Sequence, residues 1–152
     1  MRSLIAAFLA SGMACIPALA DGQRGALAQF GLIGTWSSDC GKDASQAIAS
    51  RVAFVSPPDG PETATALDGR GAFSVTTVYE IAASDMPTAD QIELALHPRT
   101  VTYSDGRTAG QHEYDSVRLV FQKAGERIQL IRIQFEGLPE IQRAIVFEKC
   151  PN

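Results

Sequence analysis

Few side chains in this sequence have the types and spacing that chemistry requires. The two histidines, His97 and His112, stand apart from any ligand-spaced partner such as a second histidine two or four residues away. Acidic residues such as Asp90 and Glu93 are close in sequence, but two-carboxylate hydrolysis needs carboxyl groups held across a cleft. The sequence also has no nucleophile elbow and no Walker-type loop. We therefore expect no catalytic residue, no metal site and no cofactor, and a protein that is not an enzyme.

The cysteines allow one covalent link. Cys40 and Cys150 form an even pair in the predicted folded part of the chain, and in an exported domain such a pair predicts a disulfide. The bridge would close a loop of roughly 110 residues, for which chain entropy gives about 4–5 kcal/mol. It also requires the two Cα atoms to lie about 4.4–6.8 Å apart, which a closed sheet achieves when its first and last strands are neighbours. Two free thiols or an intermolecular bridge are the alternatives.

Residues 1–20 predict the compartment. Arg2 supplies a positive charge, residues 4–16 are almost entirely apolar, and small residues occupy the positions that a signal peptidase reads before Asp21. This pattern is typical of a secretory signal peptide cleaved near Ala20, and the apolar run is too short for a membrane span. We therefore expect a periplasmic or secreted protein. Lipidation at Cys15, which would anchor the chain to a membrane, is the alternative.

The remaining 132 residues are enough for one domain with one core. The formal net charge of the whole chain is −4, and no basic or acidic block stands out. Such a domain is a poor binder of nucleic acid and of anionic lipid. The partners that we expect are a small apolar ligand or a periplasmic or secreted protein, without nucleic acid and without a membrane span.

Alternation of apolar and polar residues predicts the elements that would position any site. We expect residues 21–30 to be a flexible or weakly helical lead-in, and residues 41–50 to form one or two helical turns. Leu130 and Ile131 interrupt the alternation, which predicts either a bulge or a strand covered on both faces. Short strands at this spacing predict a single all-β domain over residues 31–152, an eight-stranded antiparallel barrel, with a two-sheet sandwich as the alternative. The expected strands span residues 31–38, 51–56, 63–67, 72–82, 91–103, 113–123, 127–135 and 144–148.

Gly34, Thr35 and Trp36 stand in the first predicted strand. This triplet resembles the Gly-X-Trp motif that opens lipocalins and related calycin barrels. The resemblance rests on these three residues, the strand count and the end-to-end cysteine pair. It implies a lipocalin-like barrel in which Trp36 plugs the closed end and an arginine near the last strand packs against the indole ring. Arg143 is the candidate for that cation–π contact.

Three functions fit these predictions. The first is binding of a small apolar ligand inside the barrel, although the same large side chains could simply fill the core. The second is a protein-interaction module, because the outline is similar to that of bacterial periplasmic inhibitors of secreted metalloproteases; residues 21–33 would then enter the protease. The third is an envelope accessory protein with a solid core and an exposed apolar patch. The candidate lining residues are Trp36, Phe54, Phe73, Tyr79, Leu94, Leu119 and Phe121.

Overall fold

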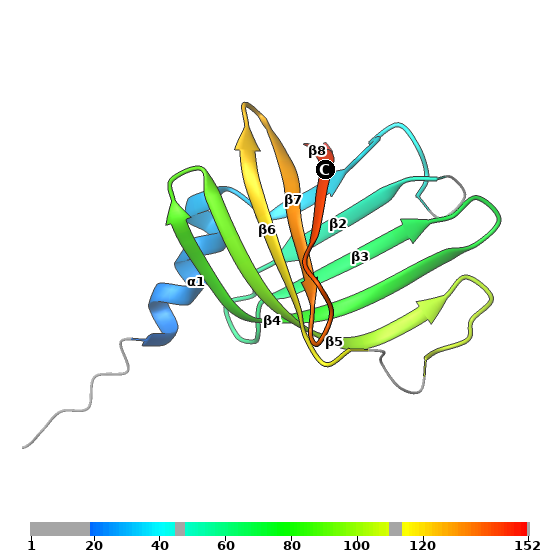
Figure 1. The fold of residues 1–152 in the computed structure, drawn as a ribbon, viewed down its shortest axis with the longest axis horizontal. Helices are drawn as coiled ribbons and strands as arrows, with labels where there is room; N and C mark the ends of the chain where they lie inside the picture. Colours follow the sequence, from blue (N-terminus) through cyan, green and yellow to red (C-terminus); the bar gives the residue numbers. More distant parts are fainter. Residues whose placement is uncertain (1–18, 45–47, 110–113, 152) are drawn as a thin grey trace, which may run out of the picture.

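The strands form one closed antiparallel barrel in which every strand pairs with its neighbours in chain order (Figure 1). The computed structural model describes residues 19–44, 48–109 and 114–151. The predicted eight-stranded barrel is confirmed, and the sandwich alternative is wrong. The strands are β1 (Gly34–Ser37), β2 (Ser50–Val55), β3 (Thr63–Gly69), β4 (Ser74–Thr88), β5 (Gln91–Tyr103), β6 (Val117–Ala124), β7 (Arg127–Phe135) and β8 (Ile141–Lys149).

The core follows from the period of two along the strands. On β5, Ile92, Leu94 and Leu96 are fully buried while the residues between them are half-exposed. Their partners across the β5–β6 ladder include Phe121, opposite Ile92, which is also buried. Each large apolar side chain that is fully buried in this way stabilises the folded state by about 1.5–3 kcal/mol.

Residues ahead of the barrel form a helix, α1 (Leu19–Phe30), rather than a loose lead-in. Leu27 is fully buried and Phe30 nearly so, and Leu32, just after the helix, is also fully buried. The helix lies beside the β4–β5 hairpin (Figure 1) and contacts both strands. The Lys123 ammonium lies 4.8 Å from the centre of the Phe30 ring. The end of α1 is therefore part of the core, whereas residues 41–44 and 48–50 contain no helix.

Trp36 is buried, but its cation is not the predicted one. Its indole Nε1 donates a hydrogen bond to the carbonyl oxygen of Leu32 at 2.7 Å, and the Lys149 ammonium lies 5.5 Å from the ring centre. Register explains this, because β1 places Trp36 directly opposite Lys149. Arg143 is exposed and six residues earlier on β8, which is about 20 Å along a strand.

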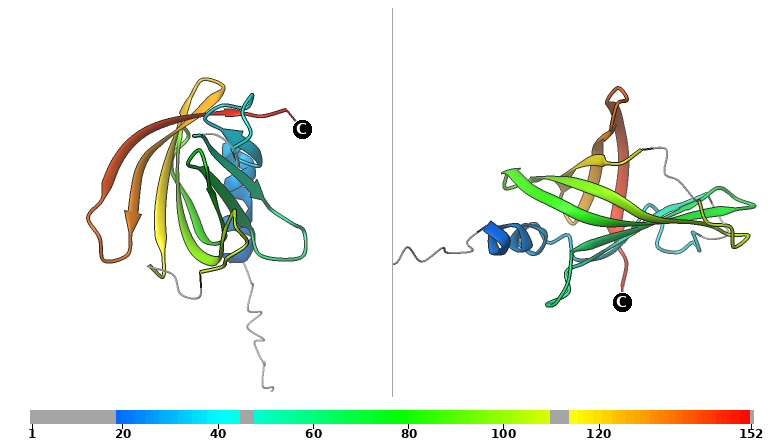
Figure 2. Two further views of the ribbon diagram at one scale, coloured as in Figure 1. Left: turned by 90° about the vertical axis from the view of Figure 1, so that its right-hand side faces the viewer. Right: turned by 90° about the horizontal axis from the view of Figure 1, so that it is seen from below.

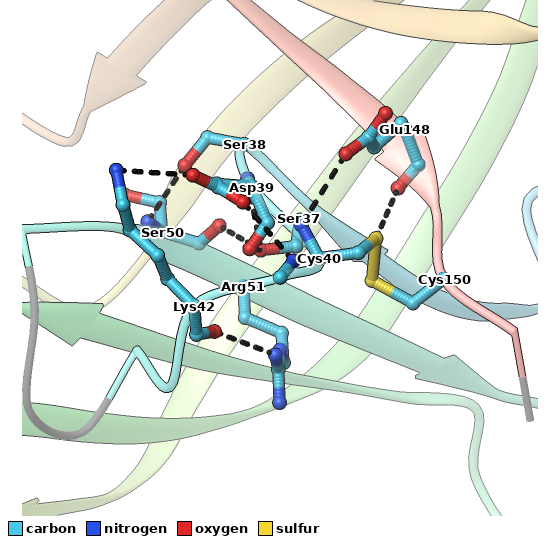
Figure 3. Close-up of a disulfide and its surroundings, with 10 residues drawn as sticks. Ser37, Ser38, Asp39, Cys40, Lys42, Ser50, Arg51, Glu148 and Cys150 are labelled. Carbon is cyan, nitrogen blue, oxygen red and sulfur yellow. Dashed lines mark hydrogen bonds and ion pairs between the residues drawn. A yellow bond between two sulfur atoms is a disulfide. The ribbon is translucent and has the colours of Figure 1, made fainter.

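The predicted disulfide between Cys40 and Cys150 is present, with Cα atoms 5.5 Å apart across a sequence separation of 110 (Figure 3). It lies where the first and last strands meet. The backbone N–H of Cys150 donates to the carbonyl oxygen of Thr35 at 2.9 Å, and that of Cys40 donates to Glu148 Oε1 at 3.3 Å.

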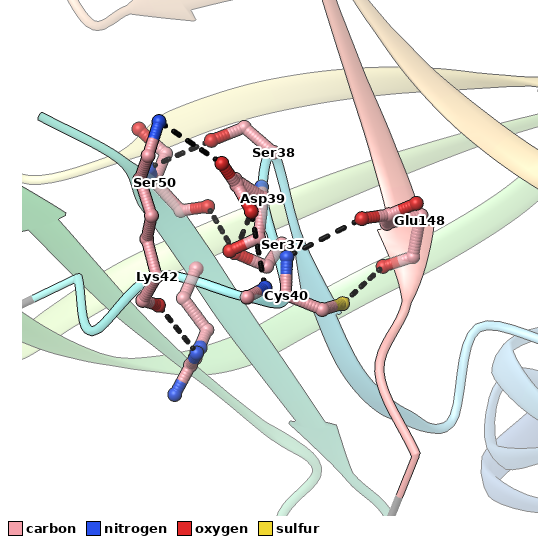
Figure 4. A network of polar contacts seen from close by, with 9 residues as sticks. Ser37, Ser38, Asp39, Cys40, Lys42, Ser50 and Glu148 are labelled. Atoms are coloured by element: carbon pink, nitrogen blue, oxygen red, sulfur yellow. Dashed lines mark hydrogen bonds and ion pairs between the residues drawn. The ribbon is translucent and has the colours of Figure 1, made fainter.

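A small polar network holds the turn that carries Cys40 (Figure 4). Ser37 Oγ lies 3.0 Å from the carbonyl oxygen of Asp39 and 3.2 Å from that of Ser50. Asp39 in turn accepts the backbone N–H of Gly41 at 3.0 Å and pairs with the Lys42 ammonium at 3.0 Å. These contacts turn the chain away from the sheet directly after β1.

The interruption at Leu130 and Ile131 is a β-bulge. Leu130 pairs with Phe121 on one side and with Ile145 on the other. Toward β6, Ile131 is an extra residue between Leu130 and Arg132, which pair with the adjacent Phe121 and Val120. Toward β8, the register shifts again, because the same gap holds Ile131 on β7 but both Arg143 and Ala144 on β8. Of the two explanations that the sequence left open, the bulge is therefore correct.

Candidate functional site

The predicted lining residues divide into three groups. Trp36, Phe54, Leu94 and Phe121 are buried, and Tyr79 and Leu119 are half-buried against the same core. Phe73 does not line the interior, because its side chain is 49% exposed. The cause is that β4 begins at Ser74, two residues later than predicted, and Phe73 belongs to a turn in which its carbonyl oxygen accepts the N–H of Arg70 at 2.8 Å.

The buried aromatic residues contact one another instead of surrounding an empty space. The rings of Phe54 and Phe121 meet edge to face with centres 5.8 Å apart. The ring of Phe147 lies 6.4 Å from that of Phe121 in the same manner. Edge-to-face pairs of this kind add about 0.5–1.5 kcal/mol beyond the area they bury. These side chains hold the barrel together, so a ligand cannot occupy their positions without displacing the core.

A hollow of about 80 Å³ lies on the outer wall instead, over Val120. Glu93 and Arg118 face each other there at 2.9 Å, and Arg132 lies 3.8 Å from Glu140. All four charges are thus paired with an opposite charge, and their side chains cover the apolar Val120. The arrangement is a surface ion-pair cluster rather than a cavity that could take an apolar ligand.

Two tyrosines meet at the inner face of the barrel wall. The hydroxyl oxygens of Tyr79 and Tyr114 are 3.0 Å apart, and the ring of Tyr114 lies 4.5 Å from that of Phe135. Burial, aided by the hydrogen bond with Tyr114, raises the pKa of Tyr79 well above its ordinary value. The Tyr79 hydroxyl therefore stays protonated in the folded protein. Tyr114 was not predicted to face the interior, because its neighbours lack the alternation of apolar and polar residues that marks an inward position.

The barrel is closed only along a short seam. β1 and β8 pair at two positions, Trp36 opposite Lys149 and Ser37 opposite Glu148. The chain then turns away at Asp39, while β8 extends back to Ile141. Within the described residues, no strand pairs with residues 141–147 on the side away from β7. We call residues 141–147 on that side the open edge; Figure 2 (left) shows β8, in red, at the margin of the sheet.

Apolar side chains adjoin the open edge. Ile141 is 38% exposed and Val146 is 41% exposed. Ile133, which is opposite Ile141, and Ile145 are half-buried against the core. The seam therefore brings apolar side chains of the core next to exposed ones. It could not be predicted from the sequence, because the first strand was predicted to span residues 31–38 and the last to begin at residue 144.

The histidine that the structure describes, His97, lies at the surface. His97 Nδ1 lies 2.9 Å from the carbonyl oxygen of Asp115 in an exposed position. His112, Cys15 and the predicted signal residues 1–18 lie outside the described part of the chain. In the part that is described, no three His, Cys, Asp or Glu side chains gather where they could hold a metal ion. The described residues likewise contain no helix with the length and apolar character needed to cross a membrane.

The chain matches no protein-family model, and neither a curated protein nor a solved structure shows significant similarity to it.

Proposed function

We propose that this chain is an exported, non-catalytic binding protein with a lipocalin-like barrel, and that it binds another protein at the seam between β8 and β1. The observation that carries this proposal is the pairing of β1 with β8 at only two positions. It leaves the backbone of the open edge without a strand partner beside Ile141 and Val146, both of them more than one-third exposed. Exposed apolar side chains next to unpaired backbone are typical of an interaction surface.

The filled interior favours a protein over a small apolar ligand as the bound partner. Phe54 and Phe121 are almost completely buried and contact each other, at positions that a ligand would need in a hollow barrel. The ordered α1 also bears on the choice between interaction modules. An inhibitor that inserts residues 21–33 into a protease needs that segment free, but Leu27, Phe30 and Leu32 are part of the core.

Export is part of the proposal. Residues 1–20 have the pattern of a cleaved signal peptide, and the Cys40–Cys150 disulfide is compatible with an oxidising compartment. We propose the periplasm or the extracellular space as the site of action, with lipidation at Cys15 as the alternative that would keep the protein at a membrane.

Site-specific photo-cross-linking in cells that export the protein tests this function. A photoreactive phenylalanine analogue would replace either Ile141 at the seam or Phe73 in the β3–β4 turn, whose side chain is also more than one-third exposed. We expect a discrete protein adduct from position 141 and none from position 73. Adducts of equal yield from both positions would contradict a binding site at the seam.

A fluorescence titration separates the two ligand classes. Purified protein would be refolded without lipid and titrated with an apolar fluorophore such as anilinonaphthalene sulfonate. We expect no saturable binding of one fluorophore per chain, because the core positions are filled. Saturable stoichiometric binding without an adduct at position 141 would replace the proposal by a small-ligand carrier.

A further inference from the structure

We infer that the partner binds as an added β-strand: an extended segment that pairs antiparallel with the open edge of β8 and places an acidic side chain opposite Arg143. This inference rests on the proposed function and names the class of partner that the seam would select. It is carried by three features of β8, namely its unpaired backbone, its apolar side chains and one exposed cation.

The backbone of β8 is satisfied on one side only. β7 pairs with residues 141–142 and 145–147 of β8, with a register shift across Arg143 and Ala144, whereas on the other side β1 reaches only Glu148 and Lys149. Backbone N–H and C=O groups are obligatory hydrogen-bonding groups, and an exposed strand edge is a ready template for one more strand. A segment added here would continue the line of β1, which already runs antiparallel to β8.

The side chains specify what the added strand carries. Ile141, Ile145 and the neighbouring Ile133 present partly exposed apolar surface, which apolar residues at alternate positions of the partner would cover. Arg143 stands between Ile141 and Ile145, is exposed, and makes no ion pair with any described residue. Directly opposite side chains in an antiparallel pair have Cβ atoms about 4.5–5.5 Å apart. An Asp or Glu at the facing position would therefore complete this surface.

The same arrangement disfavours a second copy of this chain as the occupant. An antiparallel pair of two β8 strands that sets Ile141 of one copy opposite Ile145 of the other necessarily sets Arg143 opposite Arg143. Like charges directly opposite each other destabilise a strand pair. The exposed cation, together with the β-bulge at Ile131, thus protects the edge from self-association while leaving it open to an acidic partner.

The inference is tested with two capped synthetic peptides, Thr-Thr-Val-Thr-Glu-Thr-Val-Thr and the same peptide with Lys in place of Glu. Both have high β propensity, and in the antiparallel register their central charged residue meets Arg143 when the flanking Val residues meet Ile141 and Ile145. We expect the Glu peptide to bind more tightly to the full-length protein, by about two- to tenfold in Kd, because the Lys peptide exchanges an attractive pair for a repulsive one.

Charge reversal on the protein provides the matched test. Arg143→Glu is expected to invert the preference, so that the Lys peptide binds more tightly than the Glu peptide. Arg127→Glu, at the opposite end of the β7–β8 pair, makes the same change at another exposed arginine and is expected to leave the preference unchanged. Both positions are exposed, and circular dichroism would verify that each variant is folded.

Three outcomes would overturn the inference. Amide shifts on peptide binding, measured by NMR, that fall outside residues 141–147 would mean that the peptide does not pair with β8. Equal affinity for both peptides, in the unchanged protein and in Arg143→Glu, would show that the charge of Arg143 does not select the partner. A dimer in sedimentation experiments that Ile141→Lys abolishes would make a second copy the occupant. Each of these results is compatible with an adduct from position 141, so the proposed function would be judged separately.

Discussion

Removing the Cys40–Cys150 disulfide is expected to lower the free energy of unfolding by about 4–5 kcal/mol. The bridge spans a sequence separation of 110, and the chain-entropy relation for a loop of that length gives about 4.8 kcal/mol at 25 °C. A domain of this size has a total stability of about 5–15 kcal/mol. The loss would therefore amount to between a third and nearly all of the total stability.

The location of the bridge adds a local effect. β1 and β8 pair at only two positions, so the disulfide reinforces a short seam. We expect the amides of residues 34–37 to exchange with solvent much faster in the reduced protein, while the amides of β5 and β6 keep their relative protection. Hydrogen exchange measured by NMR or mass spectrometry would resolve the two regions.

The measurement is a urea titration of the oxidised protein and of the double variant Cys40→Ser/Cys150→Ser. A reducing agent added to the double variant is the control and is expected to change nothing. The slope of unfolding with urea is expected to be larger in the variant, because its unfolded chain is less compact. A stability loss below about 1 kcal/mol, with unchanged exchange at residues 34–37, would refute the reasoning and show that packing around Trp36 closes the barrel by itself.

Two further predictions concern single side chains. Phe54→Ala is expected to lower the free energy of unfolding by about 3–5 kcal/mol because it empties a fully buried site. Phe73→Ala is expected to lower it by less than about 0.5 kcal/mol because that side chain is largely exposed. Equal losses for the two variants in urea titrations would contradict the filled core. Burial raises the pKa of Tyr79 above that of an unfolded tyrosine, so the folded chain keeps a proton that the unfolded chain loses above about pH 10, and the free energy of unfolding falls as the pH rises from there. Tyr79→Phe is expected to flatten that fall. An equal fall in both proteins, in stability measured between pH 9 and 11, would contradict the raised pKa of Tyr79.

The parts of the fold that could be predicted are those set by local pattern. The alternation of Ile92, Leu94 and Leu96 marks one face of a strand because the period of two is a property of the backbone itself. The pairing of Cys40 with Cys150 was predictable from their number and compartment, and the break at Ile131 from two adjacent apolar residues. Each of these inferences needs only neighbouring residues or a simple count.

The parts that could not be predicted depend on register between distant strands. From the sequence, Arg143 was predicted as the cation over Trp36, and only the opposition of Trp36 and Lys149 shows that Lys149 lies over the ring instead. The same register determines how little of β8 is covered by β1, and hence where the candidate site lies. Phe73 was wrongly predicted to face the interior because it directly precedes β4 and fits the alternation of apolar and polar residues that continues along the strand.

The late position of β8 relative to β1 affects the order of events during biogenesis. β1 takes its second neighbour from β8, and Cys40 pairs with Cys150, 110 residues later in the chain. Leu27 and Phe30, made early, need β4 and β5 before they can leave water. A chain interrupted before residue 148 therefore leaves β1 without its second neighbour, and one interrupted before β5 also leaves apolar side chains of α1 exposed. Chaperones retain and proteases degrade chains that expose surfaces of this type.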